Sequence, residues 1–383
     1  MSLPANLPPY GAGTLADVGP SLLAALGVDG VANPLGLEPV QRACLFVVDG
    51  LGWMQLQASP EAAPFLTSLH GSSLVAGFPS TTVSSLASIG TGLPPGEHAL
   101  TGYSTYVEEV DTVVNWLAWR GVGSAVDLRD QLVPEVVQPQ PTVWERAEDA
   151  GIATTVCTYD HFADTGLTRA VLRGGRWGGT LAEGDAVARA AEAVEVGNRS
   201  LVYVYVSALD LVGHMRGPDS DAWSVQLAIV DRIAAELADR LPAEARMFVT
   251  ADHGMVRVPE EAKVDVESTP LLQHGVAALA GEPRMRHVHT EPGARDDVLA
   301  TWTSVLGADW RVMTGDEAVS LGMFGPVVTD TARRRIGDVI AFALSDGGIV
   351  ERRRSPRLSA MPGHHGSLTD DEVLVPLLYT PGS

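Results

Sequence analysis

Three carboxylates, three imidazoles and one threonine hydroxyl stand in short, distinctive segments spread along most of the chain. These side chains belong to Asp49, Thr82, Asp210, His214, Asp252, His253 and His365. Carboxylate oxygens and imidazole nitrogens are common ligands of divalent metal ions, and this set is large enough for two ions. A threonine hydroxyl between two such ions would be activated for attack on phosphorus. The residues therefore predict a two-metal site for phosphoryl transfer.

Hydrophobic runs alternate with amphipathic helical patterns, which predicts an α/β fold of parallel strands joined by crossover helices. The predicted strands are 44–48, 153–157, 201–206 and 247–250, with late strands at 339–343 and 373–379, and the predicted helices are 141–150, 182–196 and 219–241. Asp49, Asp210 and Asp252 each follow one of these strands. Because ligands of open α/β sheets bind beyond the carboxyl ends of the strands, we expect the three carboxylates at one edge.

The segment around Thr82 supplies the candidate nucleophile. Phe78 and Pro79 end an extended approach, and small residues after Thr82 can begin a helix. The first amides and the positive dipole end of that helix would face a bound phosphate. By itself the Ser80-Thr81-Thr82 run is also typical of a simple helix cap.

The histidines differ in how strongly their local patterns indicate metal binding. Asp210 and His214 are four residues apart, and an aspartate at a strand end is often only a helix cap. Asp252 and His253 are adjacent and precede a glycine, which permits the sharp bend needed to turn both side chains onto one ion. Near the end of the chain either His364 or His365 could be a ligand, with the other adjacent to the site or exposed.

Composition limits the partners. The chain has 383 residues, 45% hydrophobic residues and a formal net charge of -21. This charge argues against binding to a nucleic acid duplex, because the backbone phosphates would be repelled. A phosphate-containing substrate would be attracted by the local charge of bound metal ions and not by the overall charge of the protein. The length and the hydrophobic content allow a sizeable hydrophobic core.

Two cysteines, Cys44 and Cys157, lie in hydrophobic strand-like runs and are expected to be reduced and buried. The first thirty residues show no leader pattern, since prolines and glycines interrupt them. No hydrophobic run is long enough to span a membrane. We therefore expect a cytoplasmic protein without membrane contact, and export stays open.

Residues 284–325 change the pattern and suggest strand, helix, strand, helix, at 284–290, 294–306, 310–314 and 316–323. We expect this stretch to form a small inserted α+β cap. The predicted organisation is a core domain at 1–283, the cap at 284–325, and the end of the core at 326–383.

Taken together, the motifs resemble a known family. FVVDG, FPSTT with TGLPPGEH, DLVGH, TADHGM and GHHG occur in the order and approximate spacing of the alkaline phosphatase superfamily. The match is most similar to its nucleotide pyrophosphatase/phosphodiesterase branch, the type I phosphodiesterases. The resemblance implies a three-layer α/β/α sandwich of the alkaline phosphatase type, with a mostly parallel central sheet.

The resemblance also implies site roles. It places Asp49, Thr82, Asp252 and His253 at one metal site, with Thr82 as the nucleophile. The second site would comprise Asp210, His214 and His365. Both ions would be zinc, although the ligand chemistry also admits manganese, iron or cobalt. The implied activity is hydrolysis of phosphate diesters or nucleotide pyrophosphates through a covalent threonine intermediate, on a small, nucleotide-like phosphate ester.

The sequence departs from the family at one position. Family diesterases carry an asparagine after the nucleophile that binds a nonbridging phosphoryl oxygen, but no asparagine occurs between Thr82 and Asn115. At the expected distance stands Tyr103, whose hydroxyl could replace it, or the amide of Val83 could serve alone. The preference for diesters over monoesters therefore stays open.

Other functions remain as alternatives. Phosphonoacetate hydrolase-like cleavage of a C–P bond uses a similar constellation, and phosphomonoester hydrolysis is a further option. A sulfatase is disfavoured because no CxPxR-like signature is present, and a phosphoglycerate mutase because an extended manganese ligand set is lacking. From another class, the protein could be a catalytically silent metal-binding scaffold.

Overall fold

The computed structural model describes residues 7–381, so residues 1–6 and 382–383 of the predicted core segments lie outside the described residues. A seven-stranded sheet forms its centre, in the order β2-β18-β9-β1-β8-β6-β7. The strands are β1 (Arg42–Val48), β2 (His70–Val75), β6 (Ala153–Tyr159), β7 (Arg176–Thr180), β8 (Ser200–Val206), β9 (Ala245–Thr250) and β18 (Leu374–Tyr379). All pairings are parallel except those of β18 with β2 and β9.

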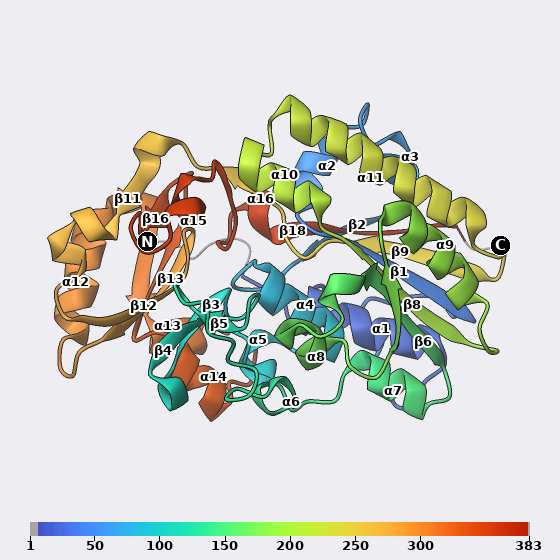
Figure 1. The fold of residues 1–383 in the computed structure, drawn as a ribbon, viewed down its shortest axis with the longest axis horizontal. Helices are drawn as coiled ribbons and strands as arrows, with labels where there is room; N and C mark the ends of the chain where they lie inside the picture. Colours follow the sequence, from blue (N-terminus) through green and yellow to red (C-terminus); the bar gives the residue numbers. More distant parts are fainter. Residues whose placement is uncertain (1–6, 382–383) are drawn as a thin grey trace.

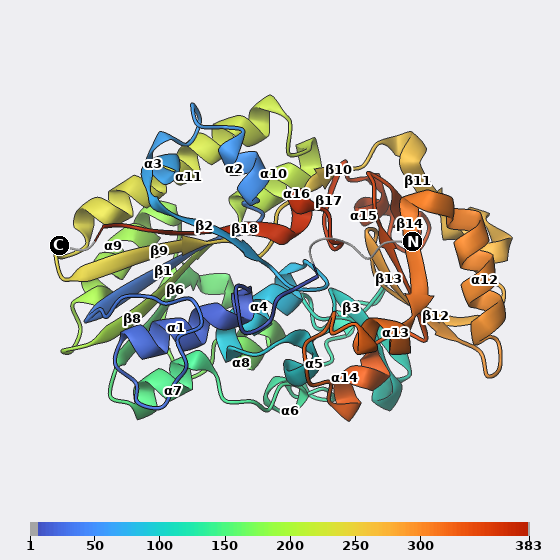
Figure 2. The ribbon, with the colours of Figure 1, turned by 180° about the vertical axis from the view of Figure 1, so that it is seen from behind.

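Helices cover both faces of this main sheet, as Figures 1 and 2 show. One layer contains α2 (Trp53–Gln57), α3 (Pro64–Ser68), α9 (Glu183–Val194), α10 (Ala208–Arg216) and α11 (Asp221–Arg240). The other contains α1 (Val18–Ala25), α4 (Thr82–Thr91), α7 (Val143–Asp149) and α8 (Gly166–Val171). Because both faces are covered, central strands such as β8 are buried along their whole length and are almost continuously hydrophobic. The predicted three-layer α/β/α sandwich is confirmed.

A second, smaller sheet carries the other hydrophobic core. Its antiparallel strands follow the order β12-β13-β15-β14. They are β12 (Val276–Glu282), β13 (Met285–Thr290), β14 (Trp310–Thr314) and β15 (Val339–Ala343). Helix α12 (Arg295–Leu306) buries Val298 and Trp302 in the same hydrophobic cluster as Val288 of β13.

The second sheet extends beyond the expected 284–325. It begins at β12, and it includes β15, which the sequence assigned to the final part of the core. Strand β15 consists of five buried hydrophobic residues. Such a run indicates that a strand is buried but not which strands it pairs with, so it is compatible with either sheet. The domain boundaries themselves stay a prediction.

The remaining strands form three further small sheets, β3-β4-β5, β10-β17 and β11-β16. The remaining strands are β3 (Ser104–Val107), β4 (Thr112–Asn115), β5 (Arg120–Gly121), β10 (Val256–Arg257), β11 (Lys263–Asp265), β16 (Gly348–Val350) and β17 (Gly363–His364). The remaining helices are α5 (Pro95–His98), α6 (Pro134–Val137), α13 (Gly315–Ser320), α14 (Asp330–Arg335), α15 (Pro356–Ala360) and α16 (Asp370–Val373). Short 3-10 turns lie at η1 (Leu15–Asp17), η2 (Glu108–Val110), η3 (Asp160–Phe162), η4 (Glu260–Ala262), η5 (Val266–Ser268), η6 (Pro270–Leu272) and η7 (Gly307–Asp309). Within residues 7–381 no helix is both long enough and apolar enough to cross a membrane.

A buried ion pair fastens the second sheet to the main one. Arg284, in the turn between β12 and β13, lies 2.6 Å from a carboxylate oxygen of Glu372 in α16, and both side chains are 0% exposed. Glu372 also accepts a hydrogen bond from the backbone N–H of Ser367 at 3.0 Å. The pair therefore holds the loop that follows His365 in place.

Candidate active site

Three neighbouring strands of the main sheet deliver the predicted carboxylates to one edge. Asp49 follows β1, Asp210 lies in the first turn of α10 after β8, and Asp252 follows β9. Gly50 adopts φ +74°, and a Cβ there would lie 2.9 Å from the Asp210 Cα. Only glycine at this position allows the two backbone segments that carry Asp49 and Asp210 to approach so closely.

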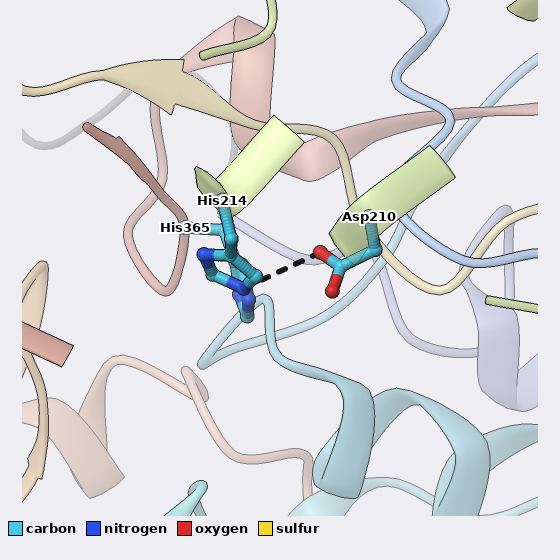
Figure 3. Close-up of side chains that lie close together, drawn as sticks. All are labelled: Asp210, His214 and His365. Carbon is cyan, nitrogen blue, oxygen red and sulfur yellow. Dashed lines mark ion pairs between the residues drawn. The ribbon is translucent and has the colours of Figure 1, made fainter. Parts of the chain in front are cut away.

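One group of potential metal ligands consists of Asp210, His214 and His365. Their ligand atoms all lie within 4.8 Å of one another. Figure 3 shows the two imidazoles beside the Asp210 carboxylate, with His214 Nε2 3.4 Å from Asp210 Oδ1. Asp210 and His214 share one face of α10, while His365 arrives from the loop after β17. The structure thus brings His365, and not His364, into this group; His364 Nε2 lies 2.9 Å from the carbonyl of Met361.

A second group surrounds Thr82. Asp49, Asp210 and His253 also have ligand atoms within 4.8 Å of one another. His253 Nε2 is 3.1 Å from the Thr82 hydroxyl and 3.4 Å from Asp252 Oδ2. The structure therefore places all seven predicted residues around one edge of the sheet, with Asp210 between the two groups.

Backbone carbonyls orient the three imidazoles. The Nδ1 atoms of His214, His253 and His365 lie 2.8, 2.9 and 2.9 Å from carbonyl oxygens of other residues. Donation from Nδ1 leaves each Nε2 free to bind a metal ion, which is the usual arrangement around metal-binding histidines. The rings of His253 and His365 stack with centroids 3.5 Å apart.

Several buried carboxylate oxygens lack a hydrogen-bond partner. They are Asp49 Oδ1, Asp210 Oδ1 and Asp252 Oδ2. Burial, and then the nearby Asp252 and Asp210, raise the pKa of Asp49 well above its usual range, and burial raises the pKa of Asp210. Burial, reinforced by His253 and His214, lowers the pKa of His365. Buried carboxylate oxygens without a hydrogen-bond donor, beside imidazole nitrogens, fit divalent cations, because a cation would compensate the charge that burial disfavours.

Helix α4 begins at Thr82 itself. Thr81 is its N-cap residue, but the Thr81 side chain makes no capping hydrogen bond. The first-turn amides, including that of Val83, therefore have no side-chain acceptor and can receive an anion at the positive end of the helix. Thr82 is buried to 8% exposure and lines a pocket of about 410 Å³.

Tyr103 lines the same pocket, and its hydroxyl has a defined role. Asn115 Nδ2 donates a hydrogen bond of 2.5 Å to it, and Asn115 Oδ1 accepts from the N–H groups of Leu117 and Ala118. Since the Tyr103 oxygen accepts from Asn115, its own hydrogen is free to point toward a ligand. Asn115 does not line the pocket, so it supports Tyr103 from behind.

The sequence analysis missed two residues of the site. Tyr205 of β8 donates a hydrogen bond to Asp49 Oδ2. Glu282 of β12 is 4% exposed, and its Oε2 lies 3.5 Å from His365 Nδ1. A carboxylate at the end of the hydrophobic run VAALAG was a usable signal for Glu282, whereas Tyr205 is indistinguishable in sequence from an ordinary core tyrosine.

The bend at Gly254 has a simple steric cause. A Cβ at Gly254 would lie 2.0 Å from the Asp371 carbonyl oxygen and 2.9 Å from the Gly52 Cα. The backbone amide of Gly254 donates to the carbonyl of Glu372. The glycine after Asp252 and His253 is therefore required for the chain to pass between α2 and α16.

Several solved structures have a similar fold. Murine ectonucleotide pyrophosphatase/phosphodiesterase 5, as an inactive variant in complex with AMP, is similar with a TM-score of 0.68 at 16% identity, over 88% of this chain and 87% of that chain. Its human counterpart is similar with a TM-score of 0.68 at 18% identity, over 88% of this chain and 87% of that chain. Phosphonoacetate hydrolase from Sinorhizobium meliloti, in complex with phosphonoformate, is similar with a TM-score of 0.67 at 20% identity, over 90% of this chain and 93% of that chain. At these identities the similarity establishes a shared fold.

None of the curated proteins compared with the sequence matches it significantly. The family description of type I phosphodiesterases and nucleotide pyrophosphatases, however, matches residues 43–368, which include every predicted site residue. The chain therefore belongs to the type I phosphodiesterase/nucleotide pyrophosphatase family of the alkaline phosphatase superfamily and is a phosphoric ester hydrolase.

Proposed function

We propose that this protein hydrolyses phosphate diesters or nucleotide pyrophosphates, with Thr82 as the nucleophile. The observation that carries the proposal is the position of the Thr82 hydroxyl, 3.1 Å from His253 Nε2 and at the first residue of α4. The amides of the first turn would bind the nonbridging oxygens of the phosphoryl group. We also propose that the substrate is a small, nucleotide-like phosphate ester and that the protein acts in the cytoplasm.

Two divalent ions, in our proposal zinc, would be held by this chain. Asp49, Asp252, His253 and Thr82 would hold one, and Asp210, His214 and His365 the other. Bound ions would supply charge neutralisation and activation of a hydroxyl group at neutral pH. The family is metal-dependent, and the unpaired carboxylate oxygens support such binding.

The chain's own residues would then act in two displacements. The Thr82 oxygen attacks phosphorus and gives up its proton, the bond from phosphorus to the leaving alcohol or phosphate breaks, and the departing alcohol oxygen takes up a proton. The phosphoryl group remains covalently attached to Thr82. Water then attacks phosphorus, the Thr82–phosphorus bond breaks, one proton of the water returns to the Thr82 oxygen, and the phosphate product leaves. Tyr103 would donate its free hydroxyl hydrogen to a nonbridging oxygen, in the place of the missing asparagine.

The test is Thr82→Ala, with Thr82→Ser as the matched control. We expect Thr82→Ala to lose turnover of bis(4-nitrophenyl) phosphate by roughly 10³-fold or more, because no second hydroxyl replaces the nucleophile. Both variants should retain bound zinc, measured by mass spectrometry of the metal content, and Thr82→Ser should keep part of the activity. Turnover of the alanine variant near that of the wild type would reject Thr82 as the nucleophile.

The same assay separates the alternatives. 4-Nitrophenyl phosphate, a dinucleotide pyrophosphate and phosphonoacetate are tested beside the diester. Preferential release of phosphate from phosphonoacetate would replace the diesterase proposal by C–P hydrolysis, and preference for the monoester would indicate a phosphomonoesterase. Stoichiometric zinc without any turnover would indicate a silent metal-binding scaffold.

A further inference from the structure

The pocket beside Thr82 is lined by both charged and hydrophobic side chains. Asp49, Asp210, His214 and His365 are among its lining residues. The hydrophobic part of the lining includes Phe162, Leu167, Val171 and Leu172 from the η3–α8 segment. At about 410 Å³, the pocket falls in the range of about 300–1,000 Å³ typical of small-molecule sites. It can therefore hold a ring-sized group attached to the reacting phosphate.

No lysine or arginine lines this pocket in the described part of the chain. The two arginines of the adjacent β12–β13 segment form ion pairs with glutamates that do not line the pocket. Arg284 pairs with Glu372 at 2.6 Å, and Arg286 pairs with Glu351 at 3.2 Å. Beyond the metal-binding edge, the wall offers no positive charge to a substituent of the substrate.

Glu282 makes the pocket still less suited to an anion. It is 4% exposed, its Oε1 has no hydrogen-bond partner, and it lines the pocket together with Tyr103. Whether protonated or ionised, Glu282 supplies no positive charge. An anionic group placed here would lose its hydration without gaining a counter-ion, which is costly in a hydrophobic site.

We propose that the pocket selects a phosphodiester whose second ester group is uncharged, and that it disfavours substituents carrying a carboxylate or a further phosphate. The inference rests on the proposed function of this site and narrows its substrate class to diesters, at the expense of nucleotide pyrophosphates, whose second phosphate would be an anionic substituent. The hydrophobic wall binds the substituent, while Glu282 and the lack of basic residues exclude anions. Leu117, which is 47% exposed at the pocket, lies where a charge would be felt by the substituent.

The test uses two matched competing ligands, diphenyl phosphate and bis(4-carboxyphenyl) phosphate, against hydrolysis of bis(4-nitrophenyl) phosphate by the zinc-loaded full chain. We expect the carboxylated ligand to inhibit at least about tenfold more weakly. The comparison is repeated at high salt, because salt screens long-range repulsion by the net charge of -21 but screens a buried pocket much less. The discrimination should persist at high salt.

Leu117→Lys and Leu117→Gln locate the effect. The ratio of the two inhibition constants, carboxylated over uncharged, should be roughly threefold smaller in the lysine variant than in the glutamine variant. Both variants place a long polar side chain at this position, but only lysine adds a positive charge. Equal inhibition by both ligands at high salt, tighter binding of the carboxylated one, or identical ratios in the two variants would overturn the inference. If bis(4-nitrophenyl) phosphate itself is not hydrolysed, the proposed function fails instead, so the two failures are distinguishable.

Discussion

At the scale of single residues, Tyr103 and Asn115 form a two-residue unit. Asn115 is held by two backbone amides and donates to the Tyr103 hydroxyl, so the orientation of that hydroxyl depends on the asparagine. Tyr103→Phe should lower kcat/KM for the diester by roughly fivefold to tenfold, the effect of one lost hydrogen bond. Steady-state kinetics measure this change.

Asn115→Ala should lose at least as much, because it also removes the bonds to the amides of Leu117 and Ala118. The double variant should lose no more than Asn115→Ala alone, because both changes remove the same contact of the Tyr103 hydroxyl. Tyr106→Phe is the matched control: its hydroxyl bonds Asp111 on the exposed side of the same hairpin, outside the pocket of Thr82. Additive losses in the double variant would show that Asn115 does not act through Tyr103.

The candidate site shows which residues a sequence can predict. Asp49, Thr82, Asp252 and His365 stand in motifs with unusual neighbours, and the structure brings them together. Tyr205 was not found because it acts on Asp49 through a contact between segments far apart in the chain. The support that Asn115 gives to Tyr103 was not found because it depends on how β3 pairs with β4. Such contacts depend on strand order, which local sequence patterns do not specify.

At the scale of elements, the β12–β13 turn is joined to α16 by the buried Arg284–Glu372 pair. Arg284→Met should lower the free energy of unfolding by about 3–5 kcal/mol, because Glu372 would be left as a buried carboxylate without its cation. Urea denaturation measures the change. Since Glu372 also binds the amide of Ser367, we expect weaker metal binding at the site of His365 as well.

Arg352→Met serves as the comparison, because its pair with Glu260 is largely exposed, with side chains 42% and 64% accessible. An exposed pair contributes less than about 1 kcal/mol, so this variant should unfold almost like the wild type. Equal destabilisation by the two substitutions would contradict a special role for the buried pair.

The elements themselves were predictable where burial is uniform. The predicted strands 44–48, 153–157, 201–206 and 247–250 correspond to β1, β6, β8 and β9. Strand β2 was missed because its first half is exposed and carries small polar residues. Strand β7 was missed because it contains two glycines and only one aromatic residue. Edge strands need fewer hydrophobic residues, so their sequences give weaker signals.

At the scale of the whole molecule, two histidines, His98 of α5 and His287 of β13, are fully buried outside the candidate site. Burial lowers the pKa of His98 to about 3 and that of His287 to about 3, from 6.5. His287 Nε2 lies 3.0 Å from the Thr101 carbonyl, and its Nδ1 accepts from the amide of Gly337. This histidine therefore connects the segment after α5 with the second sheet.

These shifts predict loss of stability in acid. Below pH 6.5 the unfolded chain binds protons that folded His98 and His287 do not, so stability is present above 6.5 and falls as the pH drops toward about 3. Each histidine contributes up to about 1.4 kcal/mol per pH unit. Urea unfolding of the metal-free protein at several pH values between neutral and mildly acidic measures the slope.

His287→Gln should reduce this slope, because glutamine does not titrate. The difference from the wild type cancels the contributions of the proposed metal ligands. His161→Gln is the control, since that side chain is exposed. An unchanged dependence of stability on pH in His287→Gln would show that His287 does not take up a proton on unfolding.

The order of the ligands along the chain has a consequence for synthesis. Between Asp252 and His365 the chain leaves the main sheet, builds the second sheet and returns. A nascent polypeptide on the ribosome therefore carries an incomplete set of the proposed ligands until the whole second sheet has been synthesised and His365 has emerged. We expect no catalytic competence before that point.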